Sequence, residues 1–293
     1  MTGWIALDWG TTALRATRMD GTDPQETRQN EAGMAGLAGD AFEPALLDLV
    51  GDWIDDAPLV IACGMVGSRQ GWHEAPYAAV PCAPLGAGLV EVPTADPRLR
   101  VRIVPGLSQQ KPHQDVMRGE ETQIAGILAH LPEFDGIACL PGTHTKWAHL
   151  SAGEVVSFRT IMTGEVFATL GRDTILRHSL GGDGWSEAAF LEAVSDALSR
   201  PETLTARLFE LRATDLLHGQ DSTTARSILS GLLIGAELAA TKPWWMGRDV
   251  VVTGSDTTTR AYAAALRAQG LDPTILAADA MTWAGLAAAR SLP

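Results

Sequence analysis

Two short turns carry the residue types that bind phosphate groups. The first is Asp8-Trp9-Gly10-Thr11-Thr12, which follows the apolar stretch 4–7. Glycine lets the backbone approach a phosphate closely, amide and hydroxyl groups donate to its oxygens, and a carboxylate such as Asp8 holds Mg²⁺ directly or through water. A hairpin turn whose Asp and Thr bond only to their own backbone has the same composition, so this turn alone fits both interpretations.

The second turn repeats this arrangement in the other half of the chain. Pro141-Gly142-Thr143-His144-Thr145 follows the apolar stretch 136–140, and His144 and Lys146 add two side chains that can donate to an anion. Taken singly, each of these two side chains is as well explained by an ordinary loop or strand position. Together, the two turns predict a site that holds the phosphate chain of a nucleotide from both sides.

A pair of acidic residues begins a predicted helix. Glu120 and Glu121 precede an apolar series at 124–131, and the helical face that carries this series extends back to the two carboxylates. We therefore expect one carboxylate on the inward side of the helix start, near the second turn. The alternative is a first-turn acid that only complements the helix dipole.

Three further loops place polar groups beside the ends of predicted strands, where open α/β sheets usually bind ligands. The loop 64–72 combines three glycines with Ser68, Arg69 and Trp72. Arg69 could bind a carboxylate bidentately, and Trp72 could cover a sugar-like chain or serve as a packing anchor. The stretch 159–165 is similar in composition, and Gly254-Ser255-Asp256 could pass beside a nucleotide base or ribose or simply cap a helix.

Hydrophobic periodicity predicts the elements that position these residues. Each half opens with a strand, a turn and two more strands, and continues with helices and buried strands. The predicted strands cover 4–9, 13–18, 26–31, 58–62, 136–140, 146–150, 154–161, 249–253 and 274–276. The predicted helices cover 42–54, 186–199, 203–211, 222–241, 257–269 and 281–290. The least periodic stretch, 72–118, predicts an irregular insertion or cap before the second domain. This order of elements predicts an α/β protein of two similar domains.

The composition limits the partners of such a protein. The chain has 293 residues, 46% apolar and 19% charged, which predicts a soluble globular protein of about two domains. A formal charge of −13 repels nucleic acids and anionic lipids, so neither is expected as a partner, and an anionic ligand needs local positive fields. Cys63, Cys82 and Cys139 have no disulfide or zinc spacing, and no segment approaches 18 uninterrupted apolar residues, so we expect a cytoplasmic protein.

Six segments, in the same order as in a known family, carry a resemblance that covers nearly the whole chain. They are 8–12 (DWGTT), 64–72 (GMVGSRQGW), 116–123 (VMRGEETQ), 141–147 (PGTHTKW), 159–165 (RTIMTGE) and 230–237 (SGLLIGAE). The first segment marks only the superfamily of sugar kinases, Hsp70 and actin. The combination of the others resembles the 2-dehydro-3-deoxygalactonokinase family within that superfamily.

The resemblance implies a fold and a reaction. It implies two ribonuclease-H-like domains, with mixed sheets flanked by helices, around an interdomain nucleotide cleft. The N-terminal domain, 1–115, would carry the acceptor-binding loops, and the C-terminal domain, 116–293, would bind the nucleotide. The implied reaction transfers the γ-phosphoryl group of ATP to the 6-hydroxyl of 2-dehydro-3-deoxy-D-galactonate. ATP and Mg²⁺ are the implied cofactors, the sugar acid is the implied small-molecule partner, and a homodimer is a possible assembly.

The resemblance also assigns roles to the nucleotide-side residues. Asp8 would organise Mg²⁺, and phosphate oxygens would be held by Gly10, Thr11, Thr12, Gly142 and Thr143, with His144 and Lys146 as further donors. Gly254 and Ser255 would form the adenosine-side loop. Phosphoryl transfer also needs a carboxylate that accepts the hydroxyl proton. Glu121 is the candidate, since its helix start resembles the catalytic glutamate region of exopolyphosphatases; Glu120 and Asp115 are the alternatives.

On the acceptor side, the resemblance implies that two stretches wall the sugar acid. These walls consist of Gly67, Ser68, Arg69 and Trp72, and of Thr163, Gly164 and Glu165. Arg69, Lys146 and Arg159 compete as the partner of the substrate carboxylate. Two other functions remain open: a phosphatase or ATPase that uses water in place of the sugar hydroxyl, and a non-enzymatic sugar-sensing protein. The second would normally need a DNA-binding segment, which the acidic charge balance does not favour.

Overall fold

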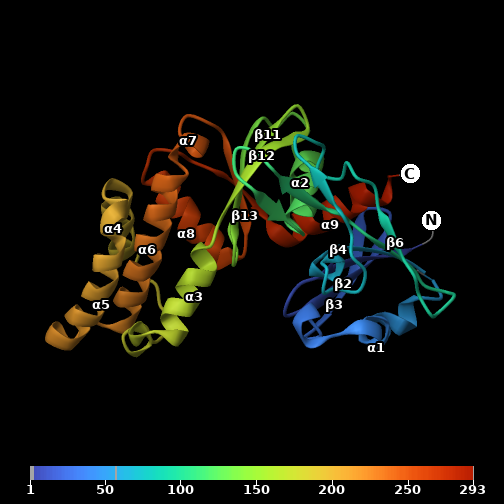
Figure 1. The fold of residues 1–293 in the computed structure, drawn as a ribbon, viewed down its shortest axis with the longest axis horizontal. Coiled ribbons are helices and arrows are strands. Elements are labelled where there is room, and N and C mark those ends of the chain that lie inside the picture. The colour runs from blue at the N-terminus through green and yellow to red at the C-terminus, as the bar shows by residue number, and fades with distance from the viewer. Residues whose placement is uncertain (1–2, 57, 293) are drawn as a thin grey trace. The chain divides into compact units, whose positions relative to one another are not determined.

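The computed structural model describes residues 3–56 and 58–292, which form two compact units (Figure 1). Unit 1 contains the chain up to Asp135, the segment Leu150–Phe158 and the segment from Leu276 onward. Unit 2 contains Gly136–His149 and Arg159–Ile275. The limits of these compact units differ from the predicted domain boundary between residues 115 and 116. That boundary stays a prediction.

Unit 1 is built on a six-stranded sheet with the order β3-β2-β1-β4-β7-β6. The strands are β1 (Trp4–Trp9), β2 (Leu14–Asp20), β3 (Asp23–Asn30), β4 (Leu59–Gly64), β6 (Val90–Val92) and β7 (Arg100–Ile103). Strand β2 pairs antiparallel with both β1 and β3, whereas β4 lies parallel to β1. Because Asp8 pairs with Cys63 in the parallel register, the carboxyl ends of β1 and β4 meet at one edge of the sheet.

Side chains of β1 alternate between two buried faces, as the pleat of a strand requires. Ile5 and Leu7 pack in the same core as Phe42 and Leu46 of α1 (Phe42–Val50), while Trp4 and Ala6 pack with the last helix, α9 (Ala278–Arg290). The helix α2 (Glu120–His130) lies against α9. A Cβ atom on Gly285 of α9 would lie only 1.8 Å from the carbonyl oxygen of Thr122, so this glycine lets α9 fix the first turn of α2.

The stretch 72–118 is more regular than predicted. It contributes β6 and β7 to the main sheet and forms a second sheet, β5-β8-β9, from Tyr77–Ala79, Gly106–Gln109 and Asp115–Met117. These strands have only three or four residues each. Strands of this length are too short to produce a recognisable alternation, so the prediction of an irregular insertion was wrong here.

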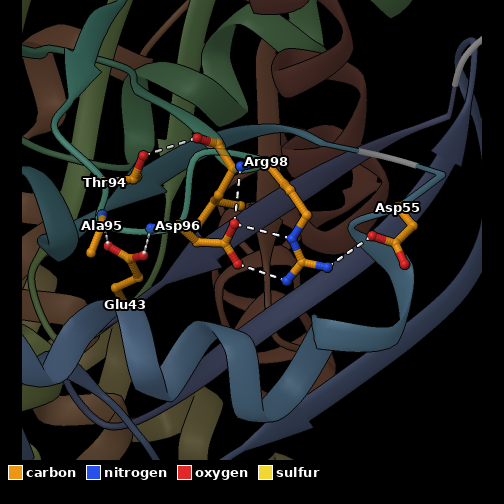
Figure 2. A network of polar contacts seen from close by, with 7 residues as sticks. Glu43, Asp55, Thr94, Ala95, Asp96 and Arg98 are labelled. Atoms are coloured by element: carbon orange, nitrogen blue, oxygen red, sulfur yellow. Dashed lines mark hydrogen bonds and ion pairs between the residues drawn. The ribbon is translucent and has the colours of Figure 1, made fainter.

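A polar network holds the loop before β7 to α1 (Figure 2). The Glu43 carboxylate accepts the backbone N–H groups of Ala95 and Asp96, each at 2.7 Å. Arg98 donates to both carboxylate oxygens of Asp96 and to Asp55 at 2.8 Å. The network orders a surface loop, and its carboxylates are occupied by protein donors.

Unit 2 contains most of a five-stranded sheet with the order β12-β11-β10-β13-β14. The strands are β10 (Gly136–Leu140), β11 (Thr145–Ser151), β12 (Glu154–Ile161), β13 (Val250–Gly254) and β14 (Thr274–Ala277). Since β10 and β13 are parallel, this sheet repeats the first five positions of the six-stranded sheet. The predicted α/β fold of two mixed sheets flanked by helices is confirmed.

The helices of unit 2 are α3 (Thr163–Asp173), α4 (Glu187–Ser199), α5 (Leu204–His218), α6 (Ser222–Ala240), α7 (Lys242–Trp245) and α8 (Asp256–Arg267). Helix α6 packs against both α4 and α5, and the three helices lie close together at the left of Figure 1. The sequence did not predict α3, which begins within the stretch interpreted as a loop. Among the described residues, none of the helices combines the length and the hydropathy needed to cross a membrane.

Candidate active site

Three chain segments converge at the edge of the unit 1 sheet where Asp8 ends. Gly64, at the end of β4, has φ 90°, and a Cβ atom there would lie 2.8 Å from the Trp9 carbonyl oxygen and 3.5 Å from Asp8 Oδ1. Gly119, just before α2, has φ 107°, and its Cβ atom would lie 3.4 Å from Gly64 Cα. Glycine at both positions therefore lets the start of α2 approach the Asp8 carboxylate.

The Asp8 carboxylate is partly exposed and already has one cationic partner. Arg15 Nη2 donates to Asp8 Oδ2 at 2.7 Å, and the other end of this guanidinium pairs with Asp279. The Arg15 guanidinium also lies 5.1 Å from the Trp283 ring. The side chain of Asp8 keeps 29% of its surface exposed, so it can still contact a ligand from the solvent side.

The turn after Asp8 is closed by its own backbone. The Gly10 N–H donates to the Ala13 carbonyl, and Gly10 and Thr11 carbonyls accept the N–H groups of Met34 and Ala35, all at 3.0 Å. Thr11 and Thr12 are exposed. The backbone contacts therefore fix the turn while leaving both threonine side chains open to a ligand.

The predicted inward position of Glu121 is confirmed, since the residue is fully buried, whereas its place near the second turn stays a prediction. Its carboxylate accepts the Gly119 N–H at 2.7 and 2.9 Å and the Thr122 hydroxyl at 3.1 Å. Burial, followed by the nearby charge of Glu120, raises the pKa of Glu121 from 4.5 to about 7. A carboxyl group with this pKa can exchange protons near neutral pH.

The charges of Asp8 and Glu121 both affect the buried thiol of Cys63. Burial raises the pKa of the Cys63 thiol, and the charges of Asp8 and Glu121 raise it further. Both carboxylates therefore lie close to Cys63, which pairs with Asp8 across β1 and β4. The alternatives Glu120 and Asp115 are partly exposed and accept the backbone N–H groups of Arg118 and Val116, respectively.

The predicted substrate-binding residues of the loop after β4 differ in their exposure. Gly67 and Ser68 are buried, whereas the Arg69 side chain is 81% exposed and lies 3.6 Å from Glu74. The Trp72 ring packs against Trp9 and Phe42, with centroids 6.0 and 6.4 Å apart. This contact supports the packing interpretation of Trp72, and its role against a sugar stays a prediction.

The second turn, in unit 2, is braced by the start of α3. A Cβ atom on Gly164 would lie 2.2 Å from the Gly142 carbonyl oxygen, and the Glu165 N–H donates to the Thr143 carbonyl at 2.9 Å. His144 Nε2 lies 2.5 Å from Glu165 Oε2. Gly142 and Thr143 are exposed, so the turn presents an ordered and accessible backbone.

A buried carboxylate on α6 fixes the elements around this turn. Glu237 accepts hydrogen bonds from Trp147 Nε1 at 2.7 Å, from Tyr262 Oη at 2.7 Å and from the Thr163 hydroxyl. The Tyr262 and Thr145 hydroxyls lie 2.9 Å apart. Burial raises the pKa of Glu237, and its three donors oppose that rise. The network joins α6 to β11, α3 and α8.

A cavity of about 520 Å³ opens beside the second turn, a size typical of small-molecule sites. Its wall includes Gly142, Thr163 and Gly164, the start of α8 at Asp256–Thr258, and the side chains of Phe167, Trp185, Arg226, Arg260 and Tyr262. The Arg226 and Arg260 guanidiniums lie 4.9 Å from the Phe167 ring and 5.4 Å from the Trp185 ring. The cavity thus offers aromatic surfaces together with two positive charges.

The remaining predicted nucleotide residues flank this cavity. A Cβ atom on Gly254 would lie 3.0 Å from the Pro141 carbonyl oxygen, so glycine brings the end of β13 against the second turn. The Ser255 side chain caps α8 by accepting the Thr258 N–H at 3.5 Å. Lys146 is buried and donates to the His144 carbonyl at 3.2 Å. Arg159 lies half-buried on β12.

The structure therefore gathers the predicted residues into two groups. In unit 1 it brings Asp8 and Glu121 together beside Gly64 and Gly119, and Ser68 follows in the loop after β4. In unit 2 it brings Thr163 and Gly164 to the second turn and its cavity. Sequence reasoning did not single out Arg118, Trp185, Arg226, Arg260 and Glu237. Two of these, Arg118 and Glu237, stand within the segments that carry the family resemblance, and this was the available signal.

Metal ligands are sparse in this arrangement. Within the described parts of the chain, no group of three or more His, Cys, Asp or Glu residues could hold a metal ion. Mg²⁺ is commonly held by one or two carboxylates together with waters and substrate phosphates. Asp8, at the end of a strand beside an exposed threonine turn, fits that kind of site.

Comparison with known sequences gives a consistent family. The sequence model of the 2-keto-3-deoxy-galactonokinase family matches residues 8–289. An Escherichia coli (strain K12) 2-dehydro-3-deoxygalactonokinase is 37% identical over 97% of this chain and 96% of its own length. A Rhizobium meliloti (strain 1021) protein that carries the same name is 40% identical over 98% of this chain and 96% of its own length.

Solved structures agree with this result. A crystal structure from Sinorhizobium meliloti that carries the 2-dehydro-3-deoxygalactonokinase name superimposes with a TM-score of 0.88 and 39% identity, covering 98% of this chain and 95% of that one. The activator of 2-hydroxyisocaproyl-CoA dehydratase from Clostridium difficile, with bound ADPNP, gives a TM-score of 0.56 at 15% identity, covering 99% and 94%. The second likeness shows a shared fold alone.

Proposed function

Because the chain belongs to the 2-keto-3-deoxy-galactonokinase family, we propose that it transfers the γ-phosphoryl group of ATP to the 6-hydroxyl of 2-dehydro-3-deoxy-D-galactonate. The observation that carries the proposal is a pair of glycine-threonine turns, one at the end of the first strand of each unit's main sheet. In unit 2 the turn borders a cavity of about 520 Å³, whereas in unit 1 it begins at a partly exposed carboxylate.

Unit 2 is the proposed nucleotide site. The backbone of Gly142 and Thr143 would hold phosphate oxygens, as would the start of α8, where the helix dipole favours negative charge. Trp185 and Phe167 offer surfaces on which a purine base can stack, and Arg226 and Arg260 supply positive charge. Thr163, Gly164 and Glu165, predicted as acceptor walls, lie in this unit, and we assign them to the nucleotide side.

Unit 1 is the proposed site of the chemistry. Thr11 and Thr12 would donate to the transferred phosphoryl group, and Asp8 would hold Mg²⁺ together with phosphate oxygens and water. The bound ion would neutralise the charge of the phosphate chain. Arg15 keeps the Asp8 carboxylate oriented through the 2.7 Å contact.

Glu121 is the proposed proton acceptor. A base works best when its pKa lies near the working pH, and burial raises the pKa of Glu121 to about 7. Its two hydrogen bonds from the Gly119 N–H fix the carboxylate at the start of α2, on the same edge of unit 1 as Asp8. The short loop at Gly119, whose φ is 107°, is the segment whose movement would bring this carboxylate to a substrate hydroxyl.

A coupled assay of ADP release over a panel of 2-keto-3-deoxy sugar acids tests the proposal. We expect Mg²⁺-dependent release that requires an acid, with the galactonate compound the best acceptor. Good turnover of another acid, with none of the galactonate compound, would refute the substrate assignment. ADP release that is independent of every acid would identify an ATPase in its place.

A further inference from the structure

The arginines of unit 1 fall into two groups by their partners. Six of them form ion pairs with carboxylates: Arg15, Arg18, Arg28, Arg69, Arg98 and Arg102. Among the described residues of unit 1, Arg100, Arg118 and Arg290 belong to no ion pair. Of these three, Arg118, two residues before α2, is the one with buried nitrogen atoms that lack a hydrogen-bond partner. An unpaired guanidinium inside a protein is costly, so its retention calls for an explanation.

The surroundings of Arg118 satisfy only part of its guanidinium. Nη2 donates to the Ala75 carbonyl at 2.7 Å, and the group lies 4.4 Å from the Tyr77 ring. Nε and Nη1 are buried and have no hydrogen-bond partner. A Cβ atom on Gly67 would lie 2.9 Å from Nη1, so glycine leaves this donor its space. The hydroxyl of the next residue, Ser68, is likewise buried without a partner.

These three unfilled groups match one end of a 2-keto acid. Its C1 carboxylate and adjacent C2 keto group present three oxygen acceptors on neighbouring carbons. Nε and Nη1 of Arg118 and the Ser68 hydroxyl present three donors. The first two belong to the guanidinium, which carries a positive charge. In a chain with a formal charge of −13, such a local cation is needed to hold an anionic substrate.

We propose that Arg118, together with Ser68, binds the C1 carboxylate of the sugar acid and selects acids over neutral sugars. This inference rests on the proposed kinase function. Arg118 replaces Arg69 as the unit 1 candidate, because the Arg69 side chain is 81% exposed and is already paired with Glu74. Tyr77 is 42% exposed above the guanidinium, and movement of its ring would admit the ligand.

Steady-state kinetics of Arg118→Met test the proposal, because methionine keeps the apolar stem and removes the guanidinium. We expect kcat/KM for 2-dehydro-3-deoxy-D-galactonate to fall about 10- to 100-fold, mainly through KM, with an unchanged KM for ATP. The second substrate is the neutral 3-deoxyhexulose in which a hydroxymethyl group replaces the carboxylate. Its low kcat/KM should be the same for the variant and the wild type.

Arg102→Met is the matched control. Arg102 lies on β7 of the same unit, half-buried and paired with Glu91, and its replacement should leave both substrates unaffected. An equal loss with the acid and the neutral sugar would show that Arg118 has only a structural role. A loss that follows Arg69→Met and not Arg118→Met would place the carboxylate at Arg69. Either result overturns the proposal.

A second pair of variants covers the case in which Arg118→Met does not fold. Arg118→Lys keeps a positive charge, and Ser68→Ala removes one hydroxyl; both should raise KM for the acid severalfold at an unchanged thermal unfolding temperature. An unchanged KM in both folded variants would mean that the buried donors hold water only. If the wild type phosphorylates no acid at all, the proposed function itself fails. If the wild type is active and the variants have an unchanged KM for the acid, only the role of Arg118 and Ser68 fails.

Discussion

Each unit buries one carboxylate near its glycine-threonine turn, and the two carboxylates have different partners. Glu121 in unit 1 accepts bonds from the adjacent Gly119 backbone and Thr122 hydroxyl, with the charge of Glu120 beside it. Glu237 in unit 2 accepts bonds from three side chains on three other elements. Burial raises the pKa of both groups and hydrogen-bond donors oppose that rise at both, but a like charge, that of Glu120, adds to the rise at Glu121 alone.

This difference separates a chemical role from an architectural one. A carboxylate whose bonds all come from its own helix start can gain or lose a proton without disturbing distant elements. A carboxylate that joins α6 to β11, α3 and α8 holds a cavity wall in place and is costly to change. We therefore assign proton transfer to Glu121 and positioning of the nucleotide cavity to Glu237.

The largest expected effect is a loss of stability on Glu237→Ala. The change removes the acceptor of the buried Trp147 Nε1 and Tyr262 hydroxyl and of the partly buried Thr163 hydroxyl, so the free energy of unfolding should fall by about 3–5 kcal/mol. Urea denaturation at neutral pH measures it. Glu210→Ala, an exposed glutamate of the same unit, should stay within about 0.5 kcal/mol of the wild type. If Glu237→Ala lowered the free energy of unfolding by less than about 1 kcal/mol, the assigned positioning role of Glu237 would be wrong.

The second effect is a pH dependence that belongs to Glu121. Its pKa is about 7 when folded and 4.5 ordinarily, so between these values the folded state binds more protons than the unfolded state. The free energy of unfolding therefore falls as pH rises from 4.5 through 7, by about 3 kcal/mol from this group. Relative to Glu121→Gln, which cannot ionise, the wild type should lose that amount between pH 4.5 and 8. Parallel stability curves would contradict the raised pKa.

The third effect is catalytic. Glu121→Gln keeps an oxygen that can accept the Gly119 N–H but removes the base, so kcat should fall roughly 10²-fold while the KM for ATP stays near normal. Glu120→Gln and Asp115→Asn, measured in parallel, should retain most of kcat. Near-normal turnover of Glu121→Gln would reduce Glu121 to a structural residue of the helix start.

The smallest effect tests the second turn. Gly164→Ala places a Cβ atom 2.2 Å from the Gly142 carbonyl oxygen, so the turn must shift and the KM for ATP should rise about tenfold. Gly171→Ala lies in the same helix, where an added Cβ atom meets no atom within 4 Å, and it serves as the control. A larger change in the KM of the sugar acid than in that of ATP would return Gly164 to the acceptor side.

The long periodic elements could be predicted from the sequence, and the short ones could not. The predicted helix at 222–241 corresponds to α6. The two predicted hairpins correspond to β1 and β2 in one sheet and to β10 and β11 in the other. Helix α3 was missed because its first turn carries Gly164 and a polar composition, which resemble a loop. The strands of the 72–118 stretch were missed because each has only three or four residues, and β7 also depends on β4, a partner distant in sequence.

The same limit applies to the site. Asp8, Glu121 and both turns could be predicted from the sequence, because short runs of neighbouring residues indicate their chemistry. The Trp185, Arg226 and Arg260 wall of the cavity could not be predicted, since these residues come from segments separated by many positions and carry no local motif. Arg118 was hidden for another reason: only burial shows that its donors lack partners, whereas by sequence Arg69 was the better candidate.

The most direct test of the central claim is the identity of the phosphorylated product. Phosphorus-31 NMR of a reaction containing ATP, Mg²⁺ and 2-dehydro-3-deoxy-D-galactonate should show a phosphomonoester resonance coupled to the two C6 protons. ADP should form in an equal amount. Inorganic phosphate as the only new phosphorus species, or an ester coupled to a different carbon of the chain, would contradict the account.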